Sequence, residues 1–304
     1  MSFKVIKPGF LSTIQDYGRL THGAHGMNQS GVMDEHAYSW ANYLLGNNFN
    51  DAVLEITFGN VELEALDDMV ICVCGAELDF KVNTQAASNW RSIQIDKGDR
   101  LSWALPKHGI RAYLAVKGGF NTQVLFNSRS VNLRENIGSK LSELDILDCQ
   151  SSCAQLEHFI APQYIPNYNT DVILRLLPSY QYFEFSDAQR SLFFNQKYRI
   201  KNANDRTGCR LDGAPMTVKK EKMISEGMSY GSVEIATDGL PIILLKDAPT
   251  IGGYPKIGTV FSLDLAKLAQ KQPNAAVKFK LMDIHQAQKE RLRFNQFFEI
   301  ALNS

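Results

Sequence analysis

The residues best suited to chemistry lie in one short stretch, 247–258, which reads Asp-Ala-Pro-Thr-Ile-Gly-Gly-Tyr-Pro-Lys-Ile-Gly. It follows an apolar run, 241–245, that predicts a buried strand. Gly252 and Gly253 have no Cβ, so the backbone can turn sharply there or lie close against a ligand. Pro255 fixes one φ angle and stiffens the loop. The loop predicts a site, with a purely structural loop as the alternative. Its catalytic candidates are an acid, a phenol and a base: Asp247, Tyr254 and Lys256.

Polar residues near the N-terminus predict a second site. Gln15, Asp16 and Arg19 lie where a strand passes into a turn, and a guanidinium can bind a carboxylate or a phosphate through two hydrogen bonds. The alternative is that Asp16 and Arg19 pair with each other and only order the turn. Glu55 is a lone carboxylate in an apolar strand, so it lies either on the solvent face or buried with a partner. We take it as a further catalytic candidate.

Cations in the second half predict an anionic ligand. Arg206 and Arg210, together with Lys256, would supply three positive charges, and a solvated charged face is the alternative. His22 and His25 lie three positions apart, but the glycines beside them indicate a loop without fixed ligand geometry. We therefore predict no metal site.

Motifs that the sequence lacks limit the reaction types. There is no Gly-x-x-x-x-Gly-Lys-[Ser/Thr] loop for nucleotide phosphates, no Gly-x-Gly-x-x-Gly after a strand, and no Gly-x-Ser-x-Gly nucleophile. There is also no Ala-Met-Lys-Met-like sequence, the mark of a biotinylated carrier. We expect that the chain does not hydrolyse ATP alone and that biotin, if it is used, arrives on another chain.

Composition predicts a globular chain without nucleic-acid or membrane partners. Of 304 residues 44% are hydrophobic and 21% charged, and 32 Lys and Arg balance 32 Asp and Glu. The first residues lack the apolar segment of a signal peptide, and apolar runs such as 69–74 are too short to span a bilayer. The five cysteines show no metal-binding spacing, so we expect reduced thiols and a cytoplasmic location.

Short apolar runs separated by Gly, Asn and Asp predict a mainly β chain. The expected strands are 53–58, 69–74, 92–95, 101–105, 111–116, 172–177, 232–236, 241–245, 259–263 and 277–281. Helices are few: three are expected to begin at the caps Asp34, Ser186 and Asp264. A fourth, amphipathic helix is expected at 284–302, with Ile284, Leu292, Phe297 and Ile300 on its apolar side. A stretch rich in Ser, Gln, Asn and Pro predicts a linker, 151–170, between domains 1–150 and 171–304.

Ordered motifs identify the family that the chain resembles. They are 13–19, 29–34, 41–47, 54–57, 204–211 and 247–258. From about residue 4 to about residue 283 the sequence resembles the biotin-dependent carboxyltransferase family, also called allophanate hydrolase subunit 2. The resemblance implies two tandem cyclophilin-like β-barrel domains with a few short helices. It also implies a set of residues that bind substrate or ATP: Gln15, Asp16, Arg19, His25, Asp34, Asn47, Arg206, Arg210, Gly252, Gly253 and Pro255. Asp34 and Asn47 bracket the first helix, so capping is their alternative role.

The resemblance also implies a function. Bacterial members of the family act as the C subunit of an ATP-dependent 5-oxoprolinase, in which ATP activates 5-oxoproline for opening to glutamate. Such a chain binds ATP and a cyclic amide substrate in complex with a B-subunit-like protein, and ring opening is completed by an A subunit. One alternative is the carboxyltransferase component of a biotin-dependent urea or amide carboxylase. Another is a non-catalytic binder of a B-subunit-like kinase-inhibitor protein. Whether the chain also forms a homo-oligomer stays open.

The sequence departs from the family motifs at positions that bear on the substrate. The usual Gly-Pro-Glu is lost at 179–181, and a Gly-Arg pair is replaced by Ser139 and Lys140. Single departures in the second half are Glu234, Ala236, Leu240, Pro249 and Ile251. They remove a glutamate, two glutamines and a threonine from the expected pocket. The fold is expected to be kept, and the substrate stays open.

Overall fold

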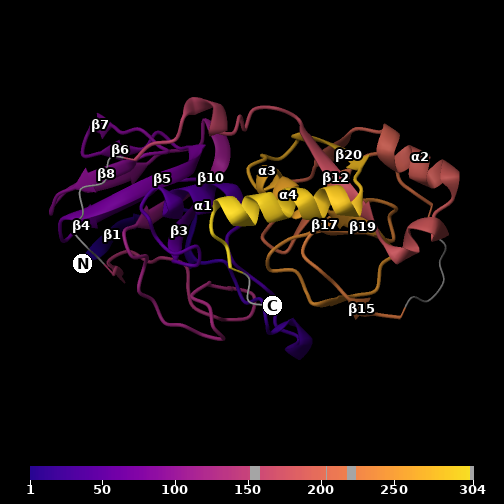
Figure 1. Ribbon diagram of the computed structural model, residues 1–304, viewed down its shortest axis with the longest axis horizontal. Helices are drawn as coiled ribbons and strands as arrows, with labels where there is room; N and C mark the ends of the chain where they lie inside the picture. Colours follow the sequence, from indigo (N-terminus) through magenta and orange to yellow (C-terminus); the bar gives the residue numbers. More distant parts are fainter. Residues whose placement is uncertain (151–157, 203, 218–223, 302–304) are drawn as a thin grey trace. The chain divides into compact units, whose positions relative to one another are not determined.

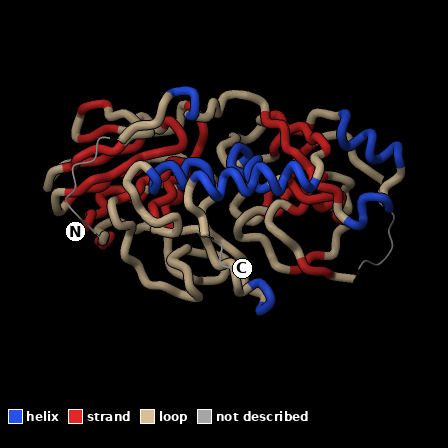
Figure 2. Tube along the Cα trace, viewed as in Figure 1, coloured by secondary structure: helices blue, strands red, loops and turns tan. Residues whose placement is uncertain are grey.

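The computed structural model describes residues 1–150, 158–202, 204–217 and 224–301. They group into two compact units: unit 1 holds Met1–Arg19, Ser30–Asn169 and Asn295–Ser304, and unit 2 holds Leu20–Gln29 and Thr170–Phe294. Both units consist mainly of strands and loops, with few helices (Figures 1 and 2). The predicted fold class, a mainly β chain with a few helices, is confirmed. The predicted domain limits stay a prediction, and residues 151–157 of the predicted linker lie outside the described residues.

The strands of unit 1 form two sheets. The first has the order β11-β1-β4-β9-β6-β7 and the second β2-β3-β10-β5-β8. The first sheet contains β1 (Ser2–Pro8), β4 (Val61–Ala65), β6 (Lys81–Val82), β7 (Gln85–Ala86), β9 (Arg100–Trp103) and β11 (Ile146–Asp148). The second contains β2 (Leu11–Gln15), β3 (Val53–Thr57), β5 (Met69–Glu77), β8 (Ser92–Ile95) and β10 (His108–Val116). Every recorded pairing within these two sheets is antiparallel.

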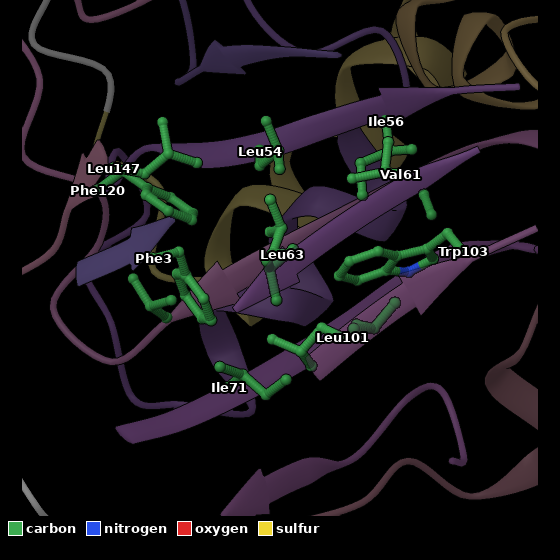
Figure 3. Packing of buried hydrophobic residues seen from close by; sticks show 14 of the residues in the cluster. Phe3, Leu54, Ile56, Val61, Leu63, Ile71, Leu101, Trp103, Phe120 and Leu147 are labelled. Atoms are coloured by element: carbon green, nitrogen blue, oxygen red, sulfur yellow. The ribbon is translucent and has the colours of Figure 1, made fainter. Parts of the chain in front are cut away.

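One hydrophobic core lies between these two sheets. In β4 Val61, Leu63 and Ala65 are buried and alternate with half-buried glutamates, as expected of a strand with one face in the core. Leu63 packs among Phe3, Ile71 and other apolar side chains from both sheets (Figure 3). The alternation in sequence therefore sets which side chains enter the core.

The strands β5 and β10 are buried on both faces, because a helix covers the face that points away from the core. This helix, α1 (Glu35–Tyr43), packs against both strands (Figure 1). Asp34 caps it: the N–H of Ala37 donates to Asp34 Oδ1 at 3.0 Å. After the helix, Gly46 has a φ of 59°, a conformation that glycine adopts without strain.

Unit 2 is built on a closed barrel with the strand order β12-β19-β16-β17-β14-β13-β20. Its strands are β12 (Val172–Pro178), β13 (Tyr198–Ile200), β14 (Gly208–Asp212), β16 (Ser232–Ile235), β17 (Pro241–Leu244), β19 (Lys256–Val260) and β20 (Ala276–Leu281). Neighbours are antiparallel except β12 and β20, which run parallel. A small antiparallel pair, β15 (Glu226–Gly227) and β18 (Ile251–Gly252), forms a separate two-stranded sheet.

The helices of the second half partly follow the predictions. In α2 (Asp187–Asn195) Ser186 is the cap, since its side chain accepts from the N–H of Gln189. The helix α3 (Ser262–Leu268) begins after Phe261, so the prediction that Asp264 caps it is wrong. Asp264 is instead buried inside the helix, where both of its oxygens accept from Arg175 at 2.8 Å.

The last helix, α4 (Ile284–Phe297), begins where expected, but its predicted apolar side is wrong in part. Ile284, Leu292 and Phe297 are each at least half exposed, whereas Ile300 is buried just after the helix. Ala287 is the buried residue of α4, and the half-exposed Phe297 stacks on Tyr43 with ring centroids 5.5 Å apart. No helix in the described part of the chain combines the length and apolarity needed to cross a membrane.

Candidate functional site

The glycine loop predicted from the sequence lies in unit 2, between the barrel strands β17 and β19. Its middle forms β18, which pairs with β15 so that Gly252 lies opposite Glu226. Lys256 begins β19 and pairs with Glu234 of β16. The loop is therefore tied at both ends to the barrel and in the middle to a second short strand.

Lys256 is held against carboxylates. Its side chain is 13% exposed, and Nζ lies 3.1 Å from Glu226 Oε1. The backbone N–H of Lys256 donates to Gln181 Oε1 at 2.6 Å. The Tyr180 hydroxyl donates to the other oxygen of Glu226, a bond that lowers the pKa of Glu226, with Lys256 adding to the effect.

Glu234 is a second carboxylate beside Lys256, and it is buried. Burial raises its pKa, while Lys256 and the backbone N–H of Tyr254 oppose the shift. Its Oε1 has no hydrogen-bond partner among the described residues. A methyl group on Gly252 would lie 2.5 Å from this oxygen, so Gly252 is the glycine that a close approach requires.

The neighbouring Gly253 differs from what the sequence analysis expected. A Cβ there would meet only Ser225 Oγ, at 3.5 Å, which is an ordinary contact. Its φ is not in the left-handed region. Gly253 therefore has neither a left-handed backbone nor a close contact with the protein's own atoms, whereas Gly252 has such a contact; the approach of Gly253 to a ligand stays a prediction.

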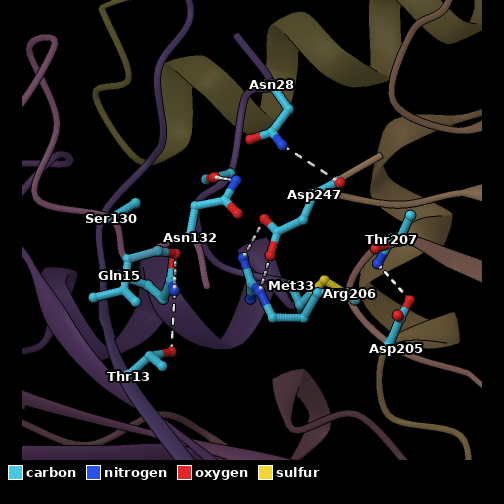
Figure 4. A network of polar contacts seen from close by, with 12 residues as sticks. Thr13, Gln15, Asn28, Met33, Ser130, Asn132, Asp205, Arg206, Thr207 and Asp247 are labelled. Carbon is cyan, nitrogen blue, oxygen red and sulfur yellow. Dashed lines mark hydrogen bonds and ion pairs between the residues drawn. The ribbon is translucent and has the colours of Figure 1, made fainter. Parts of the chain in front are cut away.

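Asp247 and Arg206 form a two-bond ion pair in unit 2. Arg206 Nε lies 2.8 Å from Asp247 Oδ2 and Nη2 lies 3.2 Å from Oδ1, and both side chains are buried. Asn28 also donates to the backbone carbonyl of Asp247, at 3.4 Å (Figure 4). The pair lets two predicted site residues contact each other, and it neutralises the charge of Arg206.

The other predicted residues of unit 2 are more exposed. Arg210 points to solvent from β14, because its neighbours Cys209 and Leu211 fill the inner face. The prediction that Arg210 joins Arg206 and Lys256 around one ligand is not supported by this strand geometry. His25 is exposed at the end of a short 3₁₀ turn, Gly23–His25.

Two further loop residues flank Lys256. Tyr254 is 37% exposed. The carbonyl of Pro255 accepts from the N–H of Ile235 at 2.9 Å. The loop thus presents the phenol outward while its backbone is fixed to β16.

Several predicted site residues of unit 1 hold the fold. Gln15 Nε2 donates to Thr13 Oγ1 and to the carbonyl of Val131, both at 3.0 Å (Figure 4). Asn47 donates to the carbonyl of Val116 at 2.7 Å. Asp34 caps α1 and accepts from the hydroxyl of Tyr168 at 3.1 Å. Asp34 thus has its alternative role as a helix cap, whereas the bonds of Gln15 and Asn47 join loops and strands; binding by these three residues stays a prediction.

Of the two alternatives given for Glu55, the structure shows the second: the carboxylate is buried with partners. Its Oε2 accepts from the N–H of Met33 at 2.8 Å and from the hydroxyl of Tyr113 at 2.9 Å. Arg111 Nε lies 3.9 Å from the other oxygen. The carboxylate is 1% exposed, so the described structure uses it to join β3, β10 and the segment before α1.

Arg19 lines a cavity in unit 1, which we call the Arg19 cavity, and Asp16 bonds residues of its wall. Asp16 accepts from the hydroxyls of Ser128 and Ser130, at 2.6 and 2.5 Å, and from the N–H of Arg129 at 2.6 Å. Arg19 is buried and donates to the carbonyl of Ser130. The cavity has a volume of about 340 Å³, and Arg129 and Lys140 line it together with Arg19. Asp16 therefore fixes the loop that carries the cations.

Comparison with known proteins decides the family. A family model described as "Carboxyltransferase domain, subdomain A and B" matches residues 25–281. The chain belongs to this family. One relative, the C subunit of the 5-oxoprolinase of Haemophilus influenzae, is 33% identical over 294 residues, which cover 94% of this chain and 93% of the relative. The Escherichia coli protein of the same name is 31% identical over 303 residues, covering 97% and 96%. The crystal structure of Kluyveromyces lactis urea carboxylase matches with a TM-score of 0.88 at 25% identity, covering 99% of this chain and 30% of that chain.

The predicted family is thus confirmed. The structure also places near the predicted site residues several side chains that the sequence analysis did not choose. Gln181 and Glu234 were noticed only as departures from the family motifs, whereas Glu226 was not noticed. An acid between apolar neighbours in β16 is the same signal that drew attention to Glu55. Arg129 carried no sequence signal, because only the folding of a distant loop brings it to Arg19. Among the described residues no cluster of three His, Cys, Asp or Glu could hold a metal ion.

Proposed function

We propose that the chain is the C subunit of an ATP-dependent 5-oxoprolinase. It acts with a B-subunit-like protein, and the opening of activated 5-oxoproline to glutamate is completed by an A subunit. The observation that carries the proposal is the pair of bacterial relatives with this name, aligned over more than nine tenths of both chains. The word subunit in their names implies an assembly of several chains.

The charges around the glycine loop support this proposal. Transfer of a phosphoryl group to a lactam oxygen concentrates negative charge, which cations must balance. Lys256 is largely buried and lies beside two carboxylates, Glu226 and Glu234. A substrate that replaced Glu226 on Lys256 would place its own negative charge against the ammonium group. Asp247, held by Arg206, is the proposed proton acceptor, and Tyr254 is the proposed hydrogen-bond donor at the loop surface.

The residues of this chain do not form a nucleotide-binding loop of their own. The sequence has no Gly-x-x-x-x-Gly-Lys-[Ser/Thr] motif, and the loop at 253–259 lacks its lysine. In this proposal ATP is therefore bound in the complex with the partner protein. We expect the isolated chain to be inactive, and biotin to take part only if another chain carries it.

A reconstitution experiment tests the proposal. The chain is co-expressed with the B- and A-subunit homologues of its own genome, and glutamate formation from 5-oxoproline and ATP is measured. We expect a stable complex with ATP-dependent turnover and no turnover by the chain alone. Turnover by the isolated chain, or an inert complex, would contradict the proposal, and the inert complex would indicate a regulatory binding protein.

Carboxyl transfer is the second candidate, and the match to the urea carboxylase structure favours it. This chain covers 30% of that protein, so the carrier and carboxylase parts would have to come from other chains. The test adds bicarbonate, urea and a biotinylated carrier to the same complexes. Bicarbonate-dependent carboxylation of an amide, without turnover of 5-oxoproline, would replace the first proposal by this one.

A further inference from the structure

Three of the four most exposed large hydrophobic residues in the described part of the chain lie beside the glycine loop of unit 2. Ile224 is 90% exposed, Phe183 80% and Tyr180 69%. Tyr180 and Phe183 lie three positions apart in the 3₁₀ helix η3 (Tyr180–Glu184), and side chains with this spacing point to the same side of such a helix. The guanidinium of Arg190 lies 5.3 Å from the centre of the Phe183 ring, so the ring is oriented while it stays exposed.

These side chains belong to one surface, because hydrogen bonds join the elements that carry them. The hydroxyl of Tyr180 donates to Glu226, which places η3 beside β15. Ile224 lies two residues before Glu226, and Ile251, which is 64% exposed, lies in β18, the partner strand of β15. We call Tyr180, Phe183, Ile224 and Ile251 the apolar rim. Single exposed apolar residues are common on proteins, whereas a contiguous group of them marks a surface that binds another molecule.

The apolar rim is connected directly to Lys256. Glu226, which accepts from Tyr180, is the same carboxylate that lies 3.1 Å from Lys256 Nζ. The Tyr180 ring centre lies 5.9 Å from this Nζ. Gln181, the next residue of η3, accepts from the backbone N–H of Lys256 at 2.6 Å. A molecule that sits on the rim therefore contacts the residues that hold Lys256 in place.

What the site lacks indicates which molecule covers the rim. Under the function proposed above, phosphoryl transfer takes place beside Lys256, yet the sequence has no Gly-x-x-x-x-Gly-Lys-[Ser/Thr] loop to hold a nucleotide. A second copy of this chain has the same sequence, so it would bring no such loop either. A different protein that takes part in nucleotide binding would complete the site, and the rim is an exposed surface through which it can reach Lys256.

We propose that the apolar rim is the surface through which the chain binds its B-subunit-like partner. This rests on the function proposed above and adds the contact that brings the partner to the glycine loop. Phe183 and Ile224 are the anchors, because the most exposed apolar side chains lose the most contact with water when a partner covers them. The partner contributes an apolar surface of its own, since the centre of an interface is poor in charged groups.

Calorimetric titration of the full chain with the purified B-subunit homologue of its own genome tests the proposal. The variants are Phe183→Ala and Ile224→Ala. The matched control is Phe159→Ala, which removes a ring that is 72% exposed in unit 1. We expect the Kd to rise about tenfold or more in each rim variant and to stay unchanged in the control. Thermal melting of the isolated variants should match that of the wild-type chain, because the side chains removed are exposed.

The outcomes separate this proposal from the proposed function. Equal affinity of the wild-type chain and both rim variants would overturn the rim assignment. So would a dimer of the isolated chain that Phe183→Ala abolishes, since a second copy would then be the occupant. Turnover of 5-oxoproline by the reconstituted complex, with the same dependence on partner concentration in both rim variants, would overturn the assignment alone. A complex held through the rim but without turnover would overturn the function and leave the assignment in place, and absence of any complex would overturn both.

Discussion

The glycine loop of unit 2 and the Arg19 cavity of unit 1 hold their cations in different ways. In the loop region Arg206 lies 2.8 Å from Asp247, and Lys256 lies 3.1 Å from Glu226. In the cavity Arg19 and Arg129 donate to carbonyl oxygens, and three lining cations face one lining carboxylate. Both regions were expected to bind anions, but the charges of the first are already balanced by side chains.

This difference indicates different tasks for similar residues. A buried ion pair fixes local structure, and removing one partner is costly because the other charge stays buried alone. A carbonyl that accepts from a guanidinium orients it through a hydrogen bond but brings no negative charge of its own. Arginines that the sequence analysis assigned to anion binding therefore make different contacts in the two regions, a side-chain carboxylate in one and a backbone carbonyl in the other.

Breaking the Arg206–Asp247 pair gives the largest expected effect. Arg206→Ala leaves a buried carboxylate without its partner, which costs about 3–5 kcal/mol. Urea unfolding followed by circular dichroism measures the loss. Arg210→Ala, in an exposed side chain of the next strand, is the matched control. A cost below about 1 kcal/mol would show that the pair does not hold the loop.

Asp16→Asn tests whether the wall of the Arg19 cavity is fixed in advance. The amide keeps one acceptor oxygen but places an NH₂ group against donors, so we expect a loss of about 1.5–3 kcal/mol in unfolding free energy. Asp96→Asn, at an exposed turn, is the control. An unchanged stability would show that Asp16 does not fix the wall of the cavity.

The two neighbouring glycines allow a matched comparison. Gly252→Ala brings a methyl group within 2.5 Å of Glu234 Oε1 and should cost about 1 kcal/mol, because a side-chain end can move aside. Gly253→Ala should leave the melting temperature nearly unchanged. Equal effects of the two substitutions, measured by thermal unfolding, would contradict the geometry given for this loop.

The smallest effect is expected for Glu234→Gln, and it has a defined pH dependence. Burial raises the pKa of Glu234 above its usual 4.5, so folding disfavours the ionised form. At pH values above the folded pKa, the buried ionised carboxylate lowers the unfolding free energy of the wild-type chain. Below pH 4.5 this loss disappears, because the carboxyl group is protonated in both the folded and the unfolded state. The glutamine variant should therefore melt about 1–2 °C higher at about pH 7, with the difference shrinking as the pH falls. A constant difference between neutral and mildly acidic pH would exclude titration of Glu234 as its cause.

Much of the fold followed from local patterns. The predicted strand 53–58 is β3, Val53–Thr57. The strand β4 was not predicted, although Val61, Leu63 and Ala65 alternate with polar residues and successive side chains of a strand point to opposite sides. Asp34 and Gly46 mark the start and end of α1 through capping and left-handed backbone, which are local properties. The ordered motifs indicated the carboxyltransferase family, which the match over residues 25–281 confirms.

The sequence by itself indicated ten of the strands, the starts of α1 and α2 and the family, since these depend on neighbours along the chain; it missed others, such as β1, β2 and β4. Only the tertiary structure decided the partners of the charged groups. Asp264 reads as a cap but bonds Arg175, 89 positions away. Arg19, Arg129 and Lys140 lie far apart in the sequence, yet all three line one cavity. Electrostatic contacts depend on distance and burial in space, and a one-dimensional spacing carries neither.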